Sequence, residues 1–324
     1  MHWKKRLFYI AAGTTTVCVA FLTKSYMGGP KYEGEKKLDG KTVIVTGANT
    51  GIGYYTVKEM ARCKAKVVMA CRDMKKCEEA RRNIVIHTRN KYIYCRRCDL
   101  ASQESIRKFA ERFQREFDQL HILINNAGIM RCPKSYTKEG IEMQLGVNHI
   151  GHFLLTNLLL DVLKKSAPSR IVNLSSAAHQ AGEINMKDLN SDIVYDPGRA
   201  YSQSKLAIVL FTKELADRLK GTGVSVYAVH PGVVDTEIIQ HMPSLTNIFT
   251  KIFLKPFAWP FIKSPDQGAQ TVLYTALEPS IADSSGSYID SDFSIAEVAE
   301  SGKNKDLAKW LWKVSESWTK LNIT

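Results

Sequence analysis

The strongest constraint on the fold is the stretch from Lys41 to Cys63, where a β-branched run, KTVIVTG, leads through the glycine-rich TGANTGIG into a helical pattern, YYTVKEMARC. Gly47, Gly51 and Gly53 stand at the junction. Glycine permits a tight turn there and leaves bare backbone amides at a helix N-terminus, the arrangement that binds phosphate. The spacing is GxxxGxG rather than the commoner GxGxxG. We therefore expect a strand, a turn and a helix that bind a dinucleotide.

The same alternation continues along the chain. Five more short runs rich in β-branched residues follow, separated by helical segments such as DMKKCEEARRNI and QESIRKFAERFQREF; the runs are AKVVMAC, KYIYCRRC, HILINNAG, RIVNLSS and VSVYAVHPG. Strands that alternate with helices form a parallel sheet with helices on both faces. The sequence thus predicts an α/β fold with a Rossmann-type, doubly wound parallel sheet, as a single domain over residues 38–300.

The two ends of the chain have different patterns. Residues 1–30 contain three basic residues, an uncharged run from Leu7 to Leu22, then Lys24 and a Gly-Gly-Pro break. A bilayer core needs about 20 apolar residues, so the run is slightly short, and no clear small-x-small cleavage site follows it. We favour a retained N-terminal membrane anchor over a cleaved signal or targeting segment. Residues 301–324 are predicted to form a C-terminal helix whose apolar stripe packs on the domain.

Charge is distributed unevenly. Residues 1–100 contain 21 Lys and Arg against 8 Asp and Glu, whereas the remainder contains 24 of each. Such a basic segment attracts anionic lipid, a phosphorylated ligand or nucleic acid. We expect no nucleic-acid partner, because no zinc-finger spacing, RNP-like aromatic motif or basic heptad array accompanies the charge.

The seven cysteines are odd in number and none lies beyond residue 132, which is unlike a secreted disulfide framework. Free thiols in a reducing compartment are the expectation. Cys95 and Cys98 form a CxxC, but no second CxxC or HxxxH completes a zinc site, so no metal is predicted.

Six motifs occur in order: TGANTGIG, NNAG at 125–128, VNHIGHF at 147–153, the serine pair 175–176, YSQSK at 201–205 and HPGVVDTE at 230–237. Together they resemble the short-chain dehydrogenase/reductase family, and the wording around them, such as GVNHIGHFLLTNLLL, is similar to its membrane-associated retinol dehydrogenase branch. The resemblance implies an NADP(H)-dependent oxidoreductase that interconverts a lipophilic alcohol and its aldehyde or ketone, with retinol and retinal as the leading pair. The alternatives are a steroid or lipid-aldehyde reductase, or a catalytically idle dinucleotide-binding membrane scaffold.

Tyr201 and Lys205 are four residues apart and therefore share one face of a helix. A free tyrosine has a pKa of about 10, and a nearby lysine ammonium would lower it, which would make the tyrosine an acid/base. A bare YxxxK is more often an ordinary helix face, but the upstream strand with its serine pair favours catalysis here. The resemblance implies that Ser176 orients the substrate oxygen and that Asn148 holds a relay water near the lysine.

Arg72 follows the second predicted strand, where arginine can hold a 2′-phosphate with two hydrogen bonds. Asp73 lies 20 residues beyond Gly53, so an NAD interpretation stays open, and Thr50 is not the basic residue that many NADP-dependent relatives carry. NADP(H) is preferred. The resemblance assigns the coenzyme to Gly47, Asn49, Thr50, Gly51, Ile52, Gly53, Arg72, Asp99, Asn126, Ala127, Gly128, Tyr201, Lys205, Pro231, Val234 and Thr236. Asp99 is expected at the adenine edge, residues 126–128 beside the ribose and residues 231–236 at the nicotinamide amide.

Two segments are candidates for the substrate side. The 24 residues between Ser176 and Tyr201 are predicted to form a loop that rims the site, with His179 a loop residue rather than a catalytic base. Residues 246–264 interleave aromatic residues with lysines, as either a membrane-interface segment or a pocket lid would. Both interpretations imply a lipophilic substrate, which the resemblance makes retinoid-like, and the first adds membrane lipid as a partner. We expect location at the endoplasmic reticulum or mitochondrial membrane; which of the two, and the oligomeric state, are left open.

Overall fold

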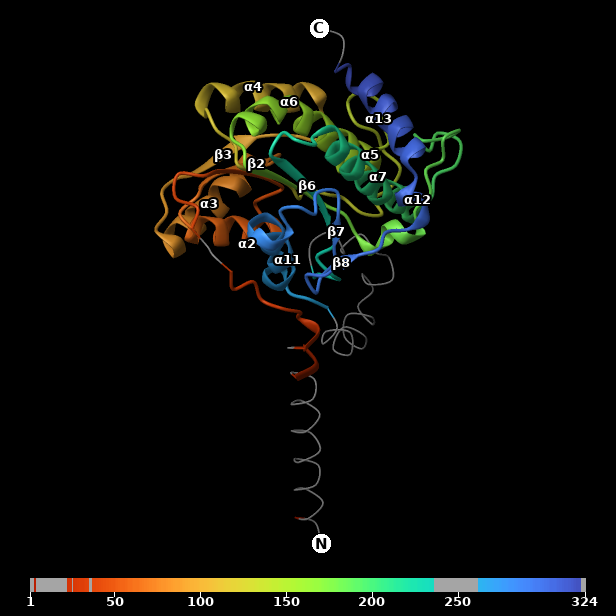
Figure 1. The fold of residues 1–324 in the computed structure, drawn as a ribbon. Coiled ribbons are helices and arrows are strands. Elements are labelled where there is room, and N and C mark those ends of the chain that lie inside the picture. The colour runs from red at the N-terminus through yellow and green to blue at the C-terminus, as the bar shows by residue number, and fades with distance from the viewer. Residues whose placement is uncertain (1–2, 4–21, 25, 35–36, 236–261, 322–324) are drawn as a thin grey trace.

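The computed structural model describes residue 3 and residues 22–24, 26–34, 37–235 and 262–321 (Figure 1). Most of the predicted anchor, most of segment 246–264 and the coenzyme candidate Thr236 lie outside these residues. Within the described ranges, no helix is long and apolar enough to cross a membrane.

One eight-stranded sheet forms the centre of the molecule, in the order β3-β2-β1-β4-β5-β6-β7-β8. The strands are β1 (Thr42–Thr46), β2 (Lys66–Cys71), β3 (Ile93–Arg97), β4 (Ile122–Asn125), β5 (Ser169–Leu174), β6 (Val224–Val229), β7 (Tyr288–Ile289) and β8 (Ile295–Ala296). All pairs are parallel except β7 with β8. The predicted parallel sheet and its first six strands are confirmed; the last two are only two residues long and carry no pattern that a sequence could reveal.

Helices cover both faces of the sheet (Figure 1). One face carries α2 (Gly51–Arg62), α3 (Met74–Thr88) and α11 (Pro265–Leu277), and the other carries α4 (Gln103–Glu116), α6 (Gly151–Lys165) and α7 (Pro197–Arg218). The last helix, α13 (Lys305–Thr319), packs on α7 through buried residues that include Leu311 and Trp312. Strands β1, β2, β4, β5 and β6 bury apolar side chains on both faces, as parallel sheets do, and β1 is buried at every position.

The order of the strands reverses between β1 and β4, which pair in parallel. At such a switch point the loops after the two strands diverge to opposite faces and leave a crevice at their carboxyl ends, where doubly wound folds bind ligands. The site is therefore expected where β1, β4 and β5 end.

A single helical run leads toward that crevice. It begins as α5 (Met143–Leu145), continues as the π-helix η1 (Gly146–Ile150) and ends as α6. Single π turns inside helices occur frequently at functional sites. The described fold also contains shorter elements: the 3-10 helices η2 (Ala177–Ala181) and η5 (Pro279–Ile281), and α12 (Glu300–Lys303).

The expectation that all cysteines are free thiols is corrected by one disulfide. Cys77 of α3 and Cys95 of β3 form a disulfide, so the prediction of free thiols is wrong for this pair. Cys77 lies on the buried face of α3 and Cys95 points to the same side of the sheet, so packing brings together two residues 18 apart in sequence. The thiols of Cys71, Cys98 and Cys132 are free.

Candidate functional site

The glycine loop after β1 has the geometry that its sequence requires. Gly47 and Gly51 have φ angles of +61° and +56°, in the left-handed region that favours glycine. A Cβ on Gly53 would lie 2.4 Å from the carbonyl oxygen of Gly47, so a larger residue would force the turn open. No acidic residue occupies the first turn of α2, and its cap residue Thr50 makes no side-chain capping bond. The amides at this helix start are thus available to an anion.

The carboxyl ends of β1 and β4 are joined through Thr46. Its hydroxyl oxygen accepts hydrogen bonds from the backbone amides of Asn126 and Ala127, each at 2.9 Å, and the Asn126 side chain donates to the Thr46 carbonyl at 2.8 Å. A Cβ on Gly47 would lie only 2.9 Å from the Cα of Ala127. The predicted residues of the glycine loop and of NNAG therefore form one cradle, and sequence reasoning missed Thr46, which organises it.

The remaining residues of the glycine loop differ in exposure. Asn49 is half-buried and Thr50 is exposed at the helix start, while Ile52 packs against the core near Gly268 of α11.

Three predicted residues lie after β2 and β3. Arg72 is exposed, and its guanidinium has no hydrogen bond or ion pair to the part of the chain that the structure describes. Asp73 is the N-cap of α3, and its carboxylate accepts from the Lys76 amide at 3.1 Å. Asp99 is half-buried and accepts from the Ala101 amide at 3.1 Å, which leaves part of its carboxylate open to a ligand.

Ser176, Tyr201 and Lys205 come together where β5 ends beside α7. The side chains of Ser176 and Tyr201 lie near enough for the serine hydroxyl to influence the pKa of the tyrosine. Lys205 is buried, and its amine donates to the carbonyl of Leu174 at 2.8 Å. Ser175 donates to the carbonyl of Lys205 at 3.1 Å, so it is a strand-end residue that fixes α7 to the sheet.

Burial dominates the electrostatics of this pair. It raises the pKa of Tyr201, although the nearby Ser176 hydroxyl and the charge of Arg131 oppose the shift. It lowers the pKa of Lys205 to about 8. The amine of Lys205 lies 5.7 Å from the centre of the Tyr201 ring. The expected low pKa of Tyr201 is therefore not found in this structure, because the loss of hydration outweighs the effects of Ser176 and Arg131.

Asn148 lies in the π turn, and its side chain joins three elements. Its Oδ1 accepts from the Ile129 amide at 2.9 Å, while Nδ2 donates to the Ile129 carbonyl at 3.0 Å and to the Ser204 hydroxyl at 2.9 Å. A Cβ on Gly128 would lie 3.4 Å from Asn148 Oδ1 and 3.7 Å from the amine of Lys205. The two polar groups thus border the same small space, which the glycine keeps open.

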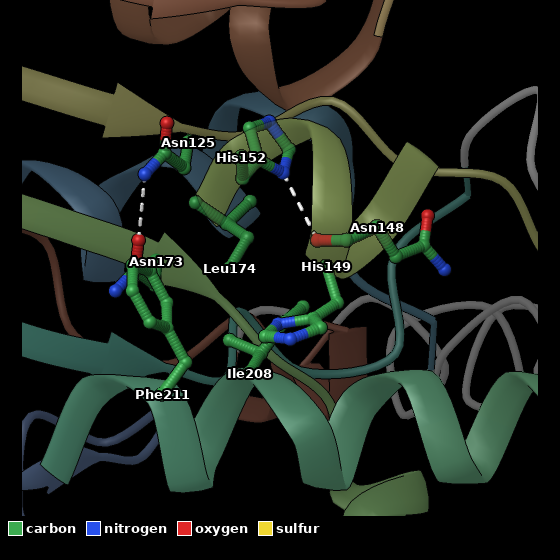
Figure 2. A pocket seen from close by; sticks show the side chains of 8 residues that line it. All are labelled: Asn125, Asn148, His149, His152, Asn173, Leu174, Ile208 and Phe211. Atoms are coloured by element: carbon green, nitrogen blue, oxygen red, sulfur yellow. Dashed lines mark hydrogen bonds between the residues drawn. The ribbon is translucent and has the colours of Figure 1, made fainter. Parts of the chain in front are cut away.

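Figure 2 shows a pocket behind Asn148, enclosed by β4, β5, the π turn and α7. Its lining residues are Asn125, Asn148, His149, His152, Asn173, Leu174, Ile208 and Phe211, and the space is too narrow to hold a water molecule. The two histidines were not singled out from the sequence. Burial lowers the pKa of His149 to about 3 and that of His152 to about 4, so both are neutral near neutral pH.

The segment after β6 closes the other side of the site. Pro231 and Val234 are buried, and Val234 pairs with Lys263 in an isolated parallel bridge. The Lys263 side chain passes Gly232, whose φ is +87°, and its amine donates to the Ser291 carbonyl at 2.9 Å. Lys263, through its bridge to Val234 and its bond to Ser291, thus fixes the segment predicted to meet the nicotinamide.

His179 lies in η2, directly after Ser176. It is buried, its Nδ1 is hydrogen-bonded to the Ser176 carbonyl at 2.7 Å, and its ring centre is 4.6 Å from that of Tyr288. Burial lowers the pKa of His179. Within its loop, this histidine supports the segment that carries Ser176.

Comparison with known proteins agrees with this geometry. The family model described as short chain dehydrogenase matches residues 41–245. Human retinol dehydrogenase 13 is 49% identical over 310 residues, which cover 95% of this chain and 93% of that protein. Human retinol dehydrogenase 12 is 49% identical over 297 residues, or 92% of each chain. Mouse retinol dehydrogenase 11 is 50% identical over 279 residues, or 86% of each chain.

Solved structures share the fold. An uncharacterized protein from Mycobacterium paratuberculosis superposes with a TM-score of 0.70 at 36% identity, covering 88% of this chain and 95% of that one. RhlG of Pseudomonas aeruginosa, solved as an NADP active-site complex, superposes with a TM-score of 0.63 at 23% identity, covering 79% of this chain and 96% of that one.

Proposed function

Because the chain belongs to the short-chain dehydrogenase family, and is an oxidoreductase that uses a nicotinamide dinucleotide, we propose that it interconverts retinol and retinal with NADP(H). The observation that carries the proposal is that Ser176 and Tyr201 lie together beside the buried Lys205, at the carboxyl end of β5 and next to the glycine cradle.

The chemistry divides between coenzyme and protein. The bound nicotinamide would supply or accept the hydride at the substrate carbon. Ser176 orients the substrate oxygen by a hydrogen bond, and Tyr201 gives that oxygen a proton in reduction and takes one in oxidation. A raised pKa suits the reductive direction, because Tyr201 keeps its proton at neutral pH.

In this proposal, Lys205 and Asn148 assist proton transfer by Tyr201. The lysine stabilises negative charge as the proton leaves the Tyr201 hydroxyl, and it binds the nicotinamide ribose. Both side-chain amide hydrogens of Asn148 are donated to protein acceptors. Its Oδ1 accepts one hydrogen bond and keeps one free lone pair near the space over Gly128. A relay water held there would return protons to the tyrosine through the lysine.

Coenzyme choice rests on the two residues after β2. Asp73 caps α3, so its carboxylate is partly committed to the helix, whereas the exposed Arg72 has no described partner. A guanidinium binds a phosphate with paired, charge-assisted hydrogen bonds. This contrast supports NADP(H) over NAD(H). The other coenzyme candidates keep the roles predicted from the motifs, with Asp99 at the adenine.

The substrate class follows from the relatives, whose names include retinol dehydrogenases 11, 12 and 13. Steroid and lipid aldehydes are less favoured, and the intact set of four catalytic candidates argues against an idle scaffold. The test is turnover of a panel of retinal, a ketosteroid and a fatty aldehyde by the full-length protein, with NADPH and with NADH. Retinal with NADPH should give the highest kcat/KM, and preference for another pair would overturn the assignment.

We further propose that the chain is membrane-associated, at the endoplasmic reticulum or mitochondrial membrane, through an anchor in residues 1–30 that precedes the catalytic domain. The uncharged run from Leu7 to Leu22 supports this proposal. The full-length protein should pellet with membranes and resist carbonate extraction, and deletion of residues 1–30 should weaken that binding. A full-length protein that stays in the supernatant would refute it.

A further inference from the structure

The imidazole of His152 connects the coenzyme cradle to the π turn that carries Asn148. His152 is the second residue of α6 and is only 3% exposed. Its Nε2 lies 2.9 Å from the Thr46 hydroxyl, and its Nδ1 lies 3.0 Å from the Asn148 carbonyl oxygen, the bond drawn in Figure 2. One ring thus bridges two parts of the site that come from different elements.

The partners of the ring determine its tautomer. The Asn148 carbonyl can only accept, so Nδ1 must carry the proton, and in a neutral ring Nε2 then accepts. The Thr46 hydroxyl can donate to Nε2 at 2.9 Å; its other acceptor, the Ile124 carbonyl, is farther away at 3.5 Å. The reverse tautomer would set a nitrogen lone pair against a carbonyl lone pair.

The surroundings keep this ring neutral. Burial lowers the pKa of His152, and the positive charge of Lys205 lowers it further, while the bond to the Asn148 carbonyl opposes the shift. The pocket beside the ring is too narrow for a water molecule that could solvate a charge. All the polar atoms are then satisfied in one direction: the amides of Asn126 and Ala127 donate to Thr46, Thr46 donates to His152, and His152 donates to Asn148.

We propose that His152 is a positioning residue that holds Asn148 in register with the coenzyme cradle; its effect on turnover rests on the proposed function. Through Thr46 the ring braces the loop that receives the coenzyme. Through the Asn148 carbonyl it sets the π turn, and with it the Oδ1 that faces Lys205 across Gly128. The bond to Thr46 should therefore affect NADPH binding, and the bond to Asn148 should affect kcat.

Two substitutions separate these bonds. In His152→Asn the amide nitrogen can take the position of Nδ1 and keep the bond to Asn148, while the bond to Thr46 is lost. In His152→Gln the amide oxygen can take the position of Nε2 and keep Thr46, while Asn148 is released. We expect His152→Asn to weaken NADPH binding about 3- to 10-fold with kcat nearly kept, and His152→Gln to lower kcat about 3- to 10-fold with NADPH binding nearly kept.

A matched control is His121, a buried histidine before β4 whose Nδ1 accepts from the Thr42 amide at 3.1 Å, at the opposite end of β1. His121→Asn and His121→Gln should change neither NADPH binding nor kcat. If both His152 variants lose binding and kcat in parallel with a drop in melting temperature, or if neither differs from wild type, the positioning role is wrong.

The tautomer is tested directly by ¹⁵N NMR of the full-length protein labelled at histidine, with the His152 signal assigned through the variants. Nδ1 should carry the proton between about pH 5.5 and 8; a protonated Nε2 would overturn the proposal. Neither the NADPH titration nor the NMR measurement of the tautomer requires a substrate. If the wild-type protein binds NADPH but fails to reduce retinal, the proposed substrate fails, and these two readouts still decide the role of His152.

Discussion

Tyr201 and Lys205 lose hydration together, and this shifts their pKa values in opposite directions. Burial keeps the tyrosine protonated and lowers the pKa of the lysine to about 8. At neutral pH the pair thus consists of a protonated phenol and a lysine that is still mostly charged. Of the two residues, the lysine titrates closer to the physiological range.

Because Lys205 loses its proton at a lower pH than Tyr201, Lys205 should determine how activity falls at alkaline pH. The kcat/KM for NADPH reports groups that ionise before coenzyme binds, so it should fall above about pH 8 as Lys205 loses its charge. Lys205→Arg keeps its charge well beyond that range, so the limb should disappear although the rate is lower. An unchanged limb in the arginine variant would assign it to another group.

In the proposed function, Arg72 selects NADP(H) over NAD(H). A charge-assisted pair of hydrogen bonds is worth about 1.5 to 3 kcal/mol, so Arg72→Ala should weaken NADPH binding roughly 10- to 150-fold. NADH binding, measured by the same fluorescence titration, should barely change. Arg82→Ala, on the exposed side of α3, is the control and should affect neither coenzyme. Equal losses for NADPH and NADH would refute the role of Arg72.

Among the elements, the helical run through the π turn is supported by the C-terminal helix. Ser315 of α13 donates to the Leu311 carbonyl at 2.8 Å, so it accepts from Nε2 of His149, also at 2.8 Å. His149 directly follows Asn148, so a bond from the end of the chain reaches the residue beside the proposed relay. Helix α13 is thus part of the support of the site.

This bond predicts a measurable stability effect. Ser315→Ala leaves a buried imidazole N–H without an acceptor, which should lower the free energy of unfolding by about 1 to 3 kcal/mol in urea denaturation. Ser317→Ala makes the same change at an exposed position of α13 and should stay within about 0.5 kcal/mol of wild type. Equal effects of the two substitutions would mean that the His149 bond is unimportant.

The elements also show what sequence could predict. The first six strands follow from their β-branched runs, and the cradle follows from glycine spacing at a strand end. The π turn, the two short strands and the Cys77–Cys95 disulfide depend on packing between distant segments, which no local pattern encodes. For the same reason Thr46 and His152 escaped notice: a threonine in a strand and a histidine in a helix become informative only when their partners are known.

The buried histidines affect the whole molecule. In the folded chain the pKa values of His149 and His152 are lowered to about 3 and about 4, whereas an unfolded histidine titrates at about 6.5. Below that pH the two histidines bind protons in the unfolded state but not in the folded state, so the free energy of unfolding decreases as the pH falls. Together the two should lower the free energy of unfolding by about 1 to 3 kcal/mol per pH unit between pH 6 and 4.5.

Denaturation at several pH values checks this effect, and His149→Gln supplies the comparison. Glutamine does not titrate, so the variant should lose about half of the pH dependence. A variant with the same slope as wild type would show that acid sensitivity arises elsewhere in the chain.

In the proposed reaction, the Tyr201 hydroxyl performs the proton transfer during NADPH-dependent reduction of retinal. The most direct test is the rate of retinal reduction by the full-length protein and by Tyr201→Phe, which keeps the ring and removes only the hydroxyl. We expect the rate to fall by about 10²-fold or more, the usual scale for a lost general acid, while the affinity for NADPH stays within about twofold. A phenylalanine variant that reduces retinal at the wild-type rate would show that the Tyr201 hydroxyl does not transfer the proton.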